Sequence, residues 1–238
     1  MIRNLLVLVL LAGGVWAQQR ASEVLKTSQG DLRITPLNHA ALLLEFSGKA
    51  IYVDPTGQAK YDGLPKADLI LLTDIHGDHL APKTIAELKK PGTAVIGPPA
   101  VKEKLPETDA VANGESKTWE GIRIEAVAAY NIERGPKPGV KYHEKGRGNG
   151  YLLALGGKRV YIAGDTECTP EMKALKSIDV AFLPMNLPYT MPVEEAAACV
   201  KVFQPKIVYP YHYRGSDLKA FESALKGQPV EVRLREWY

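Results

Sequence analysis

The pattern of apolar and polar positions divides the chain into a first part made of short strands and a second part in which strands and helices alternate. Short apolar runs separated by turn-like triplets, such as Ser47-Gly48-Lys49, predict strands. The expected strands of the first part cover residues 32–37, 40–46, 50–53, 69–72 and 94–96, with helices at 83–90 and 101–105. The run at 69–72 is apolar throughout, as in a strand buried on both faces.

The second part continues with strands joined by a tight turn and then with alternating units. Gly156-Gly157 is typical of a two-residue hairpin turn. The expected strands cover residues 122–129, 151–155, 159–163, 180–184 and 207–211, and the expected helices 170–175, 193–203 and 217–225. Strands followed by alternation indicate two sheets with helices outside. The irregular stretch 131–149 has a length typical of functional or mobile loops.

The first residues have the order of an export signal. Arg3 gives a positive start, an apolar run covers residues 5–15, and Val15-Trp16-Ala17 fits a cleavage site. We expect a signal peptide at 1–17 and a domain at 18–238. The alternative is an uncleaved anchor, but the run is shorter than the roughly 20 residues that span a membrane. The expected location is periplasmic or secreted, with no stable membrane anchor after cleavage.

Composition excludes some partners and leaves the cysteines open. The 238 residues are 45% hydrophobic and 24% charged, which suits one large domain or two small ones. A net charge of +3 is too small to indicate a nucleic-acid partner. Export permits a disulfide between Cys168 and Cys199, but sequence alone does not place them together. We interpret Cys199 as a buried small side chain on a helix and Cys168 as a loop thiol, with a soft metal ligand as its alternative.

The densest group of chemically active side chains follows the strand at 69–72. Asp74, His76, Asp78 and His79 lie within six residues. Alternate residues of an extended segment point to one side, so the first three can face one pocket. Imidazole and carboxylate groups are ligands for zinc, iron or manganese. The alternative is a polar loop in which Asp78 caps a helix; four such groups after a buried strand favour the metal site.

Three segments together resemble the metallo-β-lactamase superfamily. The segment from Thr73 to His79 resembles its H-x-H-x-D-H signature, Gly164-Asp165-Thr166 its later G-D-T segment, and Tyr211-His212-Tyr213 its terminal metal histidine. The resemblance covers residues 32–226. Asn38-His39-Ala40 and Asp54-Pro55 resemble the branch with lactonase-type and phosphodiesterase-type hydrolases. The resemblance to the superfamily implies an α/β fold, a four-layer αββα sandwich with a dinuclear site between two sheets.

The resemblance also implies which residues hold the metals. The first ion would be held by Asp74, His76 and His143, the second by Asp78, His79 and His212, with Asp165 between them. The family usually has histidine where this chain has Asp74. A carboxylate there adds negative charge, favours manganese or iron over zinc, and could leave the first position weakly occupied. The expected cofactors are two divalent ions, zinc first, with manganese or iron as alternatives.

The expected activity follows from two neighbouring ions. They would lower the pKa of a bridging water and polarise the scissile oxygen, while Asp78 and Asp165 orient the nucleophile. The substrate would be a small-molecule ester, lactone, amide or phosphodiester. Two alternatives stay open: an exported metal-binding protein with little or no catalysis, and a di-iron redox enzyme that needs a partner.

Residues around the expected site offer weaker indications. His39 either contacts the site or is hydrogen-bonded between strands, and Asp54 either orients a ligand histidine or shapes a turn. The 131–149 loop has an excess of positive charge, and it either lines the site and favours an anionic substrate or is simply solvated. Its charged residues are Arg134, Lys137, Lys141, Lys145 and Arg147 against Glu133 and Glu144. Tyr130, Tyr189, Tyr211, Tyr213 and Arg214 either wall the pocket or pack in the core.

Overall fold

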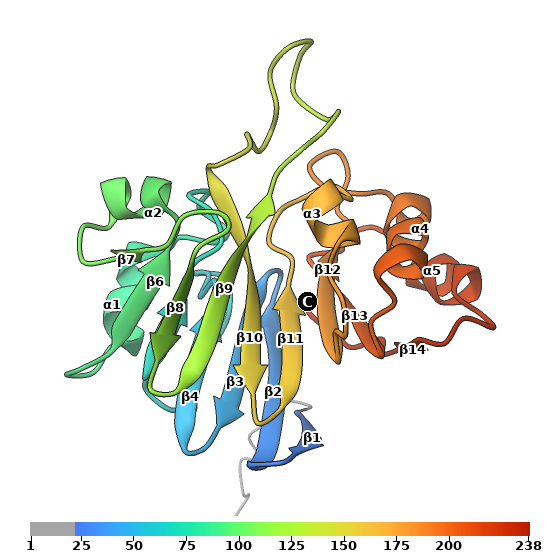
Figure 1. Ribbon diagram of the computed structural model, residues 1–238. Helices are drawn as coiled ribbons and strands as arrows, with labels where there is room; N and C mark the ends of the chain where they lie inside the picture. Colours follow the sequence, from blue (N-terminus) through green and yellow to red (C-terminus); the bar gives the residue numbers. More distant parts are fainter. Residues whose placement is uncertain (1–21) are drawn as a thin grey trace, which may run out of the picture.

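The computed structural model describes residues 22–238 and shows two facing β-sheets with helices on their outer faces (Figure 1). The first sheet has the strand order β1-β2-β3-β4-β5-β6-β7. Its strands are β1 Glu23–Thr27, β2 Gly30–Asn38, β3 Ala41–Phe46, β4 Lys49–Val53, β5 Leu69–Leu71, β6 Ala94–Gly97 and β7 Asp109–Ala110. The predicted signal peptide lies outside the described residues and stays a prediction.

The second sheet has the order β14-β13-β12-β11-β10-β9-β8. Its strands are β8 Ser116–Trp119, β9 Ile122–Ala129, β10 Gly148–Leu155, β11 Lys158–Ile162, β12 Val180–Pro184, β13 Ile207–Tyr211 and β14 Glu231–Val232. Each sheet is mixed: β1 to β4 and β8 to β11 pair antiparallel, and the other neighbours pair parallel. The predicted hairpin is present, because Leu155 pairs with Lys158 around Gly156 and Gly157, both with positive φ.

Helices cover each sheet separately. Helices α1 (Pro82–Leu88) and α2 (Pro99–Lys104) pack on the first sheet, and α3 (Pro170–Lys173), α4 (Val193–Phe203) and α5 (Leu218–Ala224) pack on the second. A third apolar cluster, with Leu42, Leu153 and Phe182, fills the space between the sheets. The predicted α/β four-layer αββα sandwich is therefore confirmed. Among residues 22–238, no helix combines the length and apolar character needed to cross a membrane.

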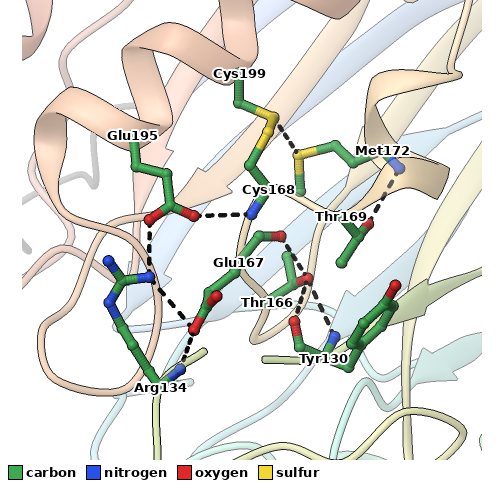
Figure 2. Close-up of a disulfide and its surroundings, with 9 residues drawn as sticks. All are labelled: Tyr130, Arg134, Thr166, Glu167, Cys168, Thr169, Met172, Glu195 and Cys199. Atoms are coloured by element: carbon green, nitrogen blue, oxygen red, sulfur yellow. Dashed lines mark hydrogen bonds and ion pairs between the residues drawn. A yellow bond between two sulfur atoms is a disulfide. The ribbon is translucent and has the colours of Figure 1, made fainter. Parts of the chain in front are cut away.

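The structure corrects the interpretation of both cysteines. Cys168 and Cys199 form a disulfide, with their Cα atoms 5.8 Å apart, so neither is a free thiol or a metal ligand (Figure 2). Cys199 lies on α4, and Cys168 lies just before α3. The sulfur of Cys199 also contacts the sulfur of Met172 at 3.3 Å. The bridge therefore ties the segment after β11 to the helix that covers the second sheet.

Candidate metal centre

The ends of five strands bring polar side chains to one edge of the sandwich. His39 follows β2, Asp54 follows β4, the 74–79 segment follows β5, Asp165 follows β11 and His212 follows β13. His143 comes from the long segment between β9 and β10, which extends beyond the sheets in Figure 1. The strands themselves are apolar and buried, and the polar side chains follow at their ends. The candidate ligands therefore lie together at this edge.

One group of potential ligands is buried except for Asp78, whose side chain is 33% exposed. His79 Nε2 lies 3.3 Å from Asp165 Oδ2, and His212 Nε2 lies 3.3 Å from Asp165 Oδ1. Both imidazole nitrogens and Asp165 Oδ1 are buried without a hydrogen-bond partner. Asp78 Oδ2 completes the group at 3.5 Å from His212 Nε2 and 3.8 Å from His79 Nε2. Unpartnered buried groups are costly in a protein interior, and this donor set fits a divalent metal ion.

Asp54 orients His79. Its carboxylate accepts a hydrogen bond from His79 Nδ1 at 2.8 Å and another from the backbone N–H of Thr73 at 2.7 Å. With Nδ1 engaged, Nε2 of His79 is the nitrogen that faces Asp165 and Asp78. Burial raises the pKa of Asp54 despite these hydrogen bonds. The first of the two sequence-based alternatives for Asp54, orientation of a histidine, describes its contacts.

A second group lies beside the first. Asp74 Oδ2 is 2.8 Å from His76 Nδ1 and 4.0 Å from His143 Nε2, and His143 Nε2 is 3.1 Å from Asp165 Oδ2. The ligand atoms of Asp74, His76 and His143 lie within 4.8 Å of one another. Asp165 therefore contacts both groups, through Oδ1 and Oδ2 on the buried side and through Oδ2 toward His143.

His143 is fixed by a network that the sequence did not reveal. Asn131 Oδ1 accepts hydrogen bonds from the backbone N–H of His143 at 2.8 Å and from its Nδ1 at 2.7 Å. Asn131 in turn donates to Glu167 Oε1 at 3.0 Å. Glu167 also accepts hydrogen bonds from three consecutive backbone N–H groups, those of residues 132–134. The start of the long loop is thus anchored next to the disulfide (Figure 2). No motif marks Asn131 or Glu167, because their partners lie far away in sequence.

His39 contacts the site and is itself hydrogen-bonded to Trp237 and Tyr238. Its Nε2 is 2.9 Å from Asp78 Oδ2, and its Nδ1 is 2.7 Å from the hydroxyl of Tyr238. Its backbone donates to the carbonyl of Trp237 at 3.2 Å. Burial lowers the pKa of His39. Burial would raise the pKa of Asp78, but the nearby imidazole of His212 and the hydrogen bond with His39 hold it well below its usual range. Trp237 and Tyr238, which sequence reasoning missed, therefore hold a side chain that touches a candidate ligand.

Without a bound ion, the acids and histidines of the buried group set each other's protonation states through their opposite charges. Burial would raise the pKa of Asp165, but the charges of His212 and His79 and a hydrogen bond with His143 hold it well below its usual range. Burial would lower the pKa of His79, but the carboxylates of Asp165 and Asp54 raise it well above its usual value. Without an ion, these opposite charges therefore favour ionised acids and a protonated His79, and His79 must lose its proton to act as a metal ligand.

Several site residues adopt a left-handed backbone. His39, Asp54 and His212 have φ values of 56°, 43° and 46°. Gly164, with φ of 68°, precedes Asp165, and a Cβ there would lie 2.7 Å from the carbonyl oxygen of Asn149. Only glycine accommodates both the left-handed turn and this close approach. Strained backbone of this kind clusters at functional sites.

A cavity of about 640 Å³ opens over the two groups. Its wall includes His39, Tyr189 and Arg214, together with Lys141, Tyr142 and Gln58. The rings of Tyr142 and Tyr189 meet edge to face with centroids 5.0 Å apart. The other three tyrosines considered from the sequence pack elsewhere: Tyr130 donates to Glu171, Tyr211 accepts from Gly164, and Tyr213 donates to the carbonyl of Arg235.

The positive residues of the long loop divide between the site and the surface. Arg147 pairs with Asp74, and Lys141 lines the cavity. Arg134 pairs with Glu167 and Glu195, and Lys145 with Glu171, both away from the cavity wall. Neither sequence-based alternative, a loop that lines the site or a solvated loop, describes all of these residues.

Comparison with known proteins agrees with this architecture. A family model for the beta-lactamase superfamily domain matches residues 33–212. A UPF0173 metal-dependent hydrolase from Pyrococcus furiosus is 36% identical over 199 residues, covering 76% of this chain and 84% of its own. The chain therefore belongs to the beta-lactamase superfamily.

Two solved structures are also similar to this chain. The crystal structure of a candidate metal-dependent hydrolase from Parabacteroides distasonis is 45% identical, has a TM-score of 0.87, and covers 92% of this chain and 100% of its own. Igni18, a metallo hydrolase from Ignicoccus hospitalis, is 24% identical with a TM-score of 0.73, covering 86% of this chain and 95% of its own. At that identity the second likeness concerns the fold alone.

Proposed function

We propose that this metal-dependent hydrolase of the beta-lactamase superfamily holds two divalent ions, zinc in the first instance, and cleaves a small anionic ester, lactone, amide or phosphodiester. The observation that carries the proposal is the arrangement of two adjacent ligand groups around one carboxylate. Asp74, His76 and His143 form one group, His79, His212 and Asp165 form the other with Asp78 beside them, and Asp165 also contacts His143. Such sharing is what a dinuclear site needs.

The ions, when bound, would make hydroxide available near neutral pH and polarise the scissile oxygen. The chain's own residues position the reaction. Asp165 and Asp78 present carboxylate oxygens toward the space between the histidines and would orient the attacking water. His39 holds Asp78 through Nε2, and Asp54 holds His79 through Nδ1. These contacts fix ring and carboxylate orientations before a substrate arrives.

The cavity wall supports the preference for an anionic substrate. Lys141 and Arg214 both line the cavity above the two groups. Arg214 lies 5.1 Å from the ring of Tyr238 and donates weakly to Gln58 at 3.5 Å, with no ion-pair partner among the described residues. A phosphate or carboxylate group of the substrate would give this guanidinium an ion-pair partner.

Metal content tests the proposal. Elemental analysis of the mature protein should give about two equivalents of zinc or manganese. His76→Ala should fall to about one, because its group loses a ligand, and Asp165→Ala should fall further, because both groups lose one. Asp31→Ala is the matched control, since among the described residues this exposed carboxylate pairs only with Lys26. One equivalent or none in the unaltered protein would overturn the two-ion mechanism and favour a binding or mononuclear role.

Kinetics test the substrate class. Lys141→Ala and Arg214→Ala should each raise KM for a phosphodiester such as bis(4-nitrophenyl) phosphate and leave KM for a neutral lactone unchanged. The reason is that only the anionic substrate uses these charges. Equal effects on both substrates would argue against an anionic preference.

We also infer that the protein is exported. The N-terminal pattern supports this inference, and so does the Cys168–Cys199 disulfide, because such bridges persist mainly in oxidising compartments. Mass spectrometry of the protein from its native host should find a mature N-terminus at Gln18. An intact N-terminus with cytosolic fractionation would contradict the inference.

A further inference from the structure

Arg147 is the residue of the site whose role neither the resemblance nor the comparisons assign. Its Nε lies 3.1 Å from Asp74 Oδ1 and its Nη2 lies 3.2 Å from Asp74 Oδ2, a two-pronged pair. Its Nη2 also lies 3.4 Å from His76 Nε2. Asp74 is 2% exposed and Arg147 is 21% exposed at the side chain, so the pair is largely shielded from water. Two-pronged pairs of this kind fix carboxylate geometry as well as charge.

The backbone holds Arg147 in this place. Arg147 immediately precedes β10, and the backbone N–H of Asn149 donates to the carbonyl of Thr73 at 2.9 Å. Between them, Gly148 packs so closely that a Cβ would lie 3.2 Å from the Thr73 oxygen and 3.6 Å from Asp74 Oδ1. The start of β10 is therefore fixed against the segment that carries Asp74. Arg147 is a built contact and not a surface arginine that happens to fold back.

The charge of Arg147 matters because the site is rich in carboxylates. Asp74, Asp78 and Asp165 all face the two groups. Two guanidinium nitrogens of Arg147 lie within hydrogen-bond distance of the Asp74 carboxylate, so the contact has the geometry of an ion pair. A carboxylate brings a negative charge to this position, where a neutral histidine would add none. The adjacent guanidinium cancels that extra charge.

We propose that Arg147 is a positioning residue for the group of Asp74, His76 and His143: its guanidinium orients Asp74 as a ligand and neutralises it, so that the Asp74–Arg147 pair replaces a neutral histidine. Asp74 Oδ2 faces His76 Nδ1 and His143 Nε2, the other members of the group. Among the described residues, Arg147 contacts Asp74 and His76 but forms no hydrogen bond or ion pair with His143 or Asp165. A guanidinium that took the place of the ion would be expected to meet those residues as well. The proposal rests on the two-ion function proposed above.

A double-mutant cycle on the full mature chain tests the charge argument. Zinc is titrated by calorimetry into chelator-stripped protein, and cobalt absorption reports the geometry of each ion. The unaltered protein should bind two ions. Arg147→Gln should keep the ion of the buried group and bind the other about 10- to 100-fold more weakly, as expected when a partner of a ligand is lost. Asp74→His alone should also weaken that ion, because the guanidinium then faces a neutral ring beside a cation.

The double variant Asp74→His/Arg147→Gln should restore two tight ions, since charge and ligand are both replaced. Arg147→Lys keeps the charge without the fork and should lie between the extremes. Lys145→Gln is the control, because this loop cation pairs with Glu171. Thermal unfolding of the stripped proteins shows whether each variant folds.

The outcomes separate the two proposals. Two tight ions in Arg147→Gln would overturn the role of Arg147 and leave the proposed function intact. A double variant as weak as Arg147→Gln would overturn the charge argument. One ion in the unaltered protein would overturn the proposed function; a second ion gained by Arg147→Gln would then show that the guanidinium occupies the place of an ion.

Discussion

Replacing both cysteines of the disulfide with alanine removes a crosslink between the segment after β11 and α4. The bridge closes a loop of 31 residues, and the chain-entropy relation for a loop of that length gives about 4 kcal/mol at 25 °C. That is a large share of the roughly 5–15 kcal/mol by which domains are stable. Because both cysteines are buried, the alanine variant also loses a little packing. We therefore expect the free energy of unfolding to fall by about 4 kcal/mol.

Urea unfolding at neutral pH measures this loss. With a slope of about 2–3 kcal/mol per molar, the midpoint should fall by roughly 1–2 M. The unaltered protein treated with reductant should unfold near the midpoint of the alanine variant, and reductant should not affect the variant itself. A thiol assay of the unfolded protein should find free thiols only after reduction. A shift below about 1 kcal/mol with a verified bridge would refute the loop-entropy reasoning.

Three further predictions concern single carboxylates. Asp54→Asn should weaken metal binding about 10- to 100-fold in competition with a chelator, because His79 loses the carboxylate that orients it; unchanged affinity would contradict this role. Asp217→Ala removes the cap that accepts from the backbone N–H groups of Lys219 and Ala220 in the first turn of α5, so unfolding should become about 1 kcal/mol easier in urea while metal content stays the same. Burial would raise the pKa of Asp179, but hydrogen bonds from the Arg159 N–H and Lys206 lower it. Its ionised form therefore stabilises the fold above the ordinary carboxyl range, and this stability is lost as pH falls through the folded pKa. Asp179→Asn should unfold more easily at pH 7, and its difference from the unaltered protein should close below about pH 4; a constant difference would exclude the linkage.

The sequence predicted that the candidate ligands follow strand ends, and the structure places these residues there. Strands such as β5 and β12 are apolar at every residue because both faces are buried, so the first polar residues after β5 mark a strand end. Parallel neighbours then place successive ends at one edge, which brings Asp54 beside the 74–79 segment in the first sheet and places Asp165 and His212 at the same edge of the second. The spacing of apolar residues within a single strand is therefore enough to predict where that strand is buried and where it ends.

The strands that sequence reasoning missed are short or lie at edges. β1 alternates between half-buried and exposed positions, and β8 does the same, so neither shows an apolar run. β7 and β14 have two residues each. Their pairing depends on a neighbouring strand that already exists, which is information that no window of sequence contains.

Contacts between segments far apart in the sequence were the other features that could not be predicted from it. The disulfide joins residues 31 apart, and the pair Arg147–Asp74 joins residues 73 apart. A basic loop gives the same composition whether its cations meet solvent or a buried carboxylate. Only the register of β10 against Thr73 decides that Arg147 reaches Asp74. The choice between a basic surface and a built ion pair is therefore made by tertiary structure.

The strained strand ends explain why the site depends on its surroundings. His39, Asp54 and His212 each hold a left-handed backbone that costs on the order of 1–3 kcal/mol. Backbone hydrogen bonds offset that cost: His212 donates to the carbonyl of His39, and His39 donates to that of Trp237. The ligands are thus arranged by the two sheets and the terminal residues before any ion arrives, so that little of the binding energy is needed to order them. Changes at Trp237 should therefore act on metal affinity through His39 and His212, although its side chain lies in the core between the sheets.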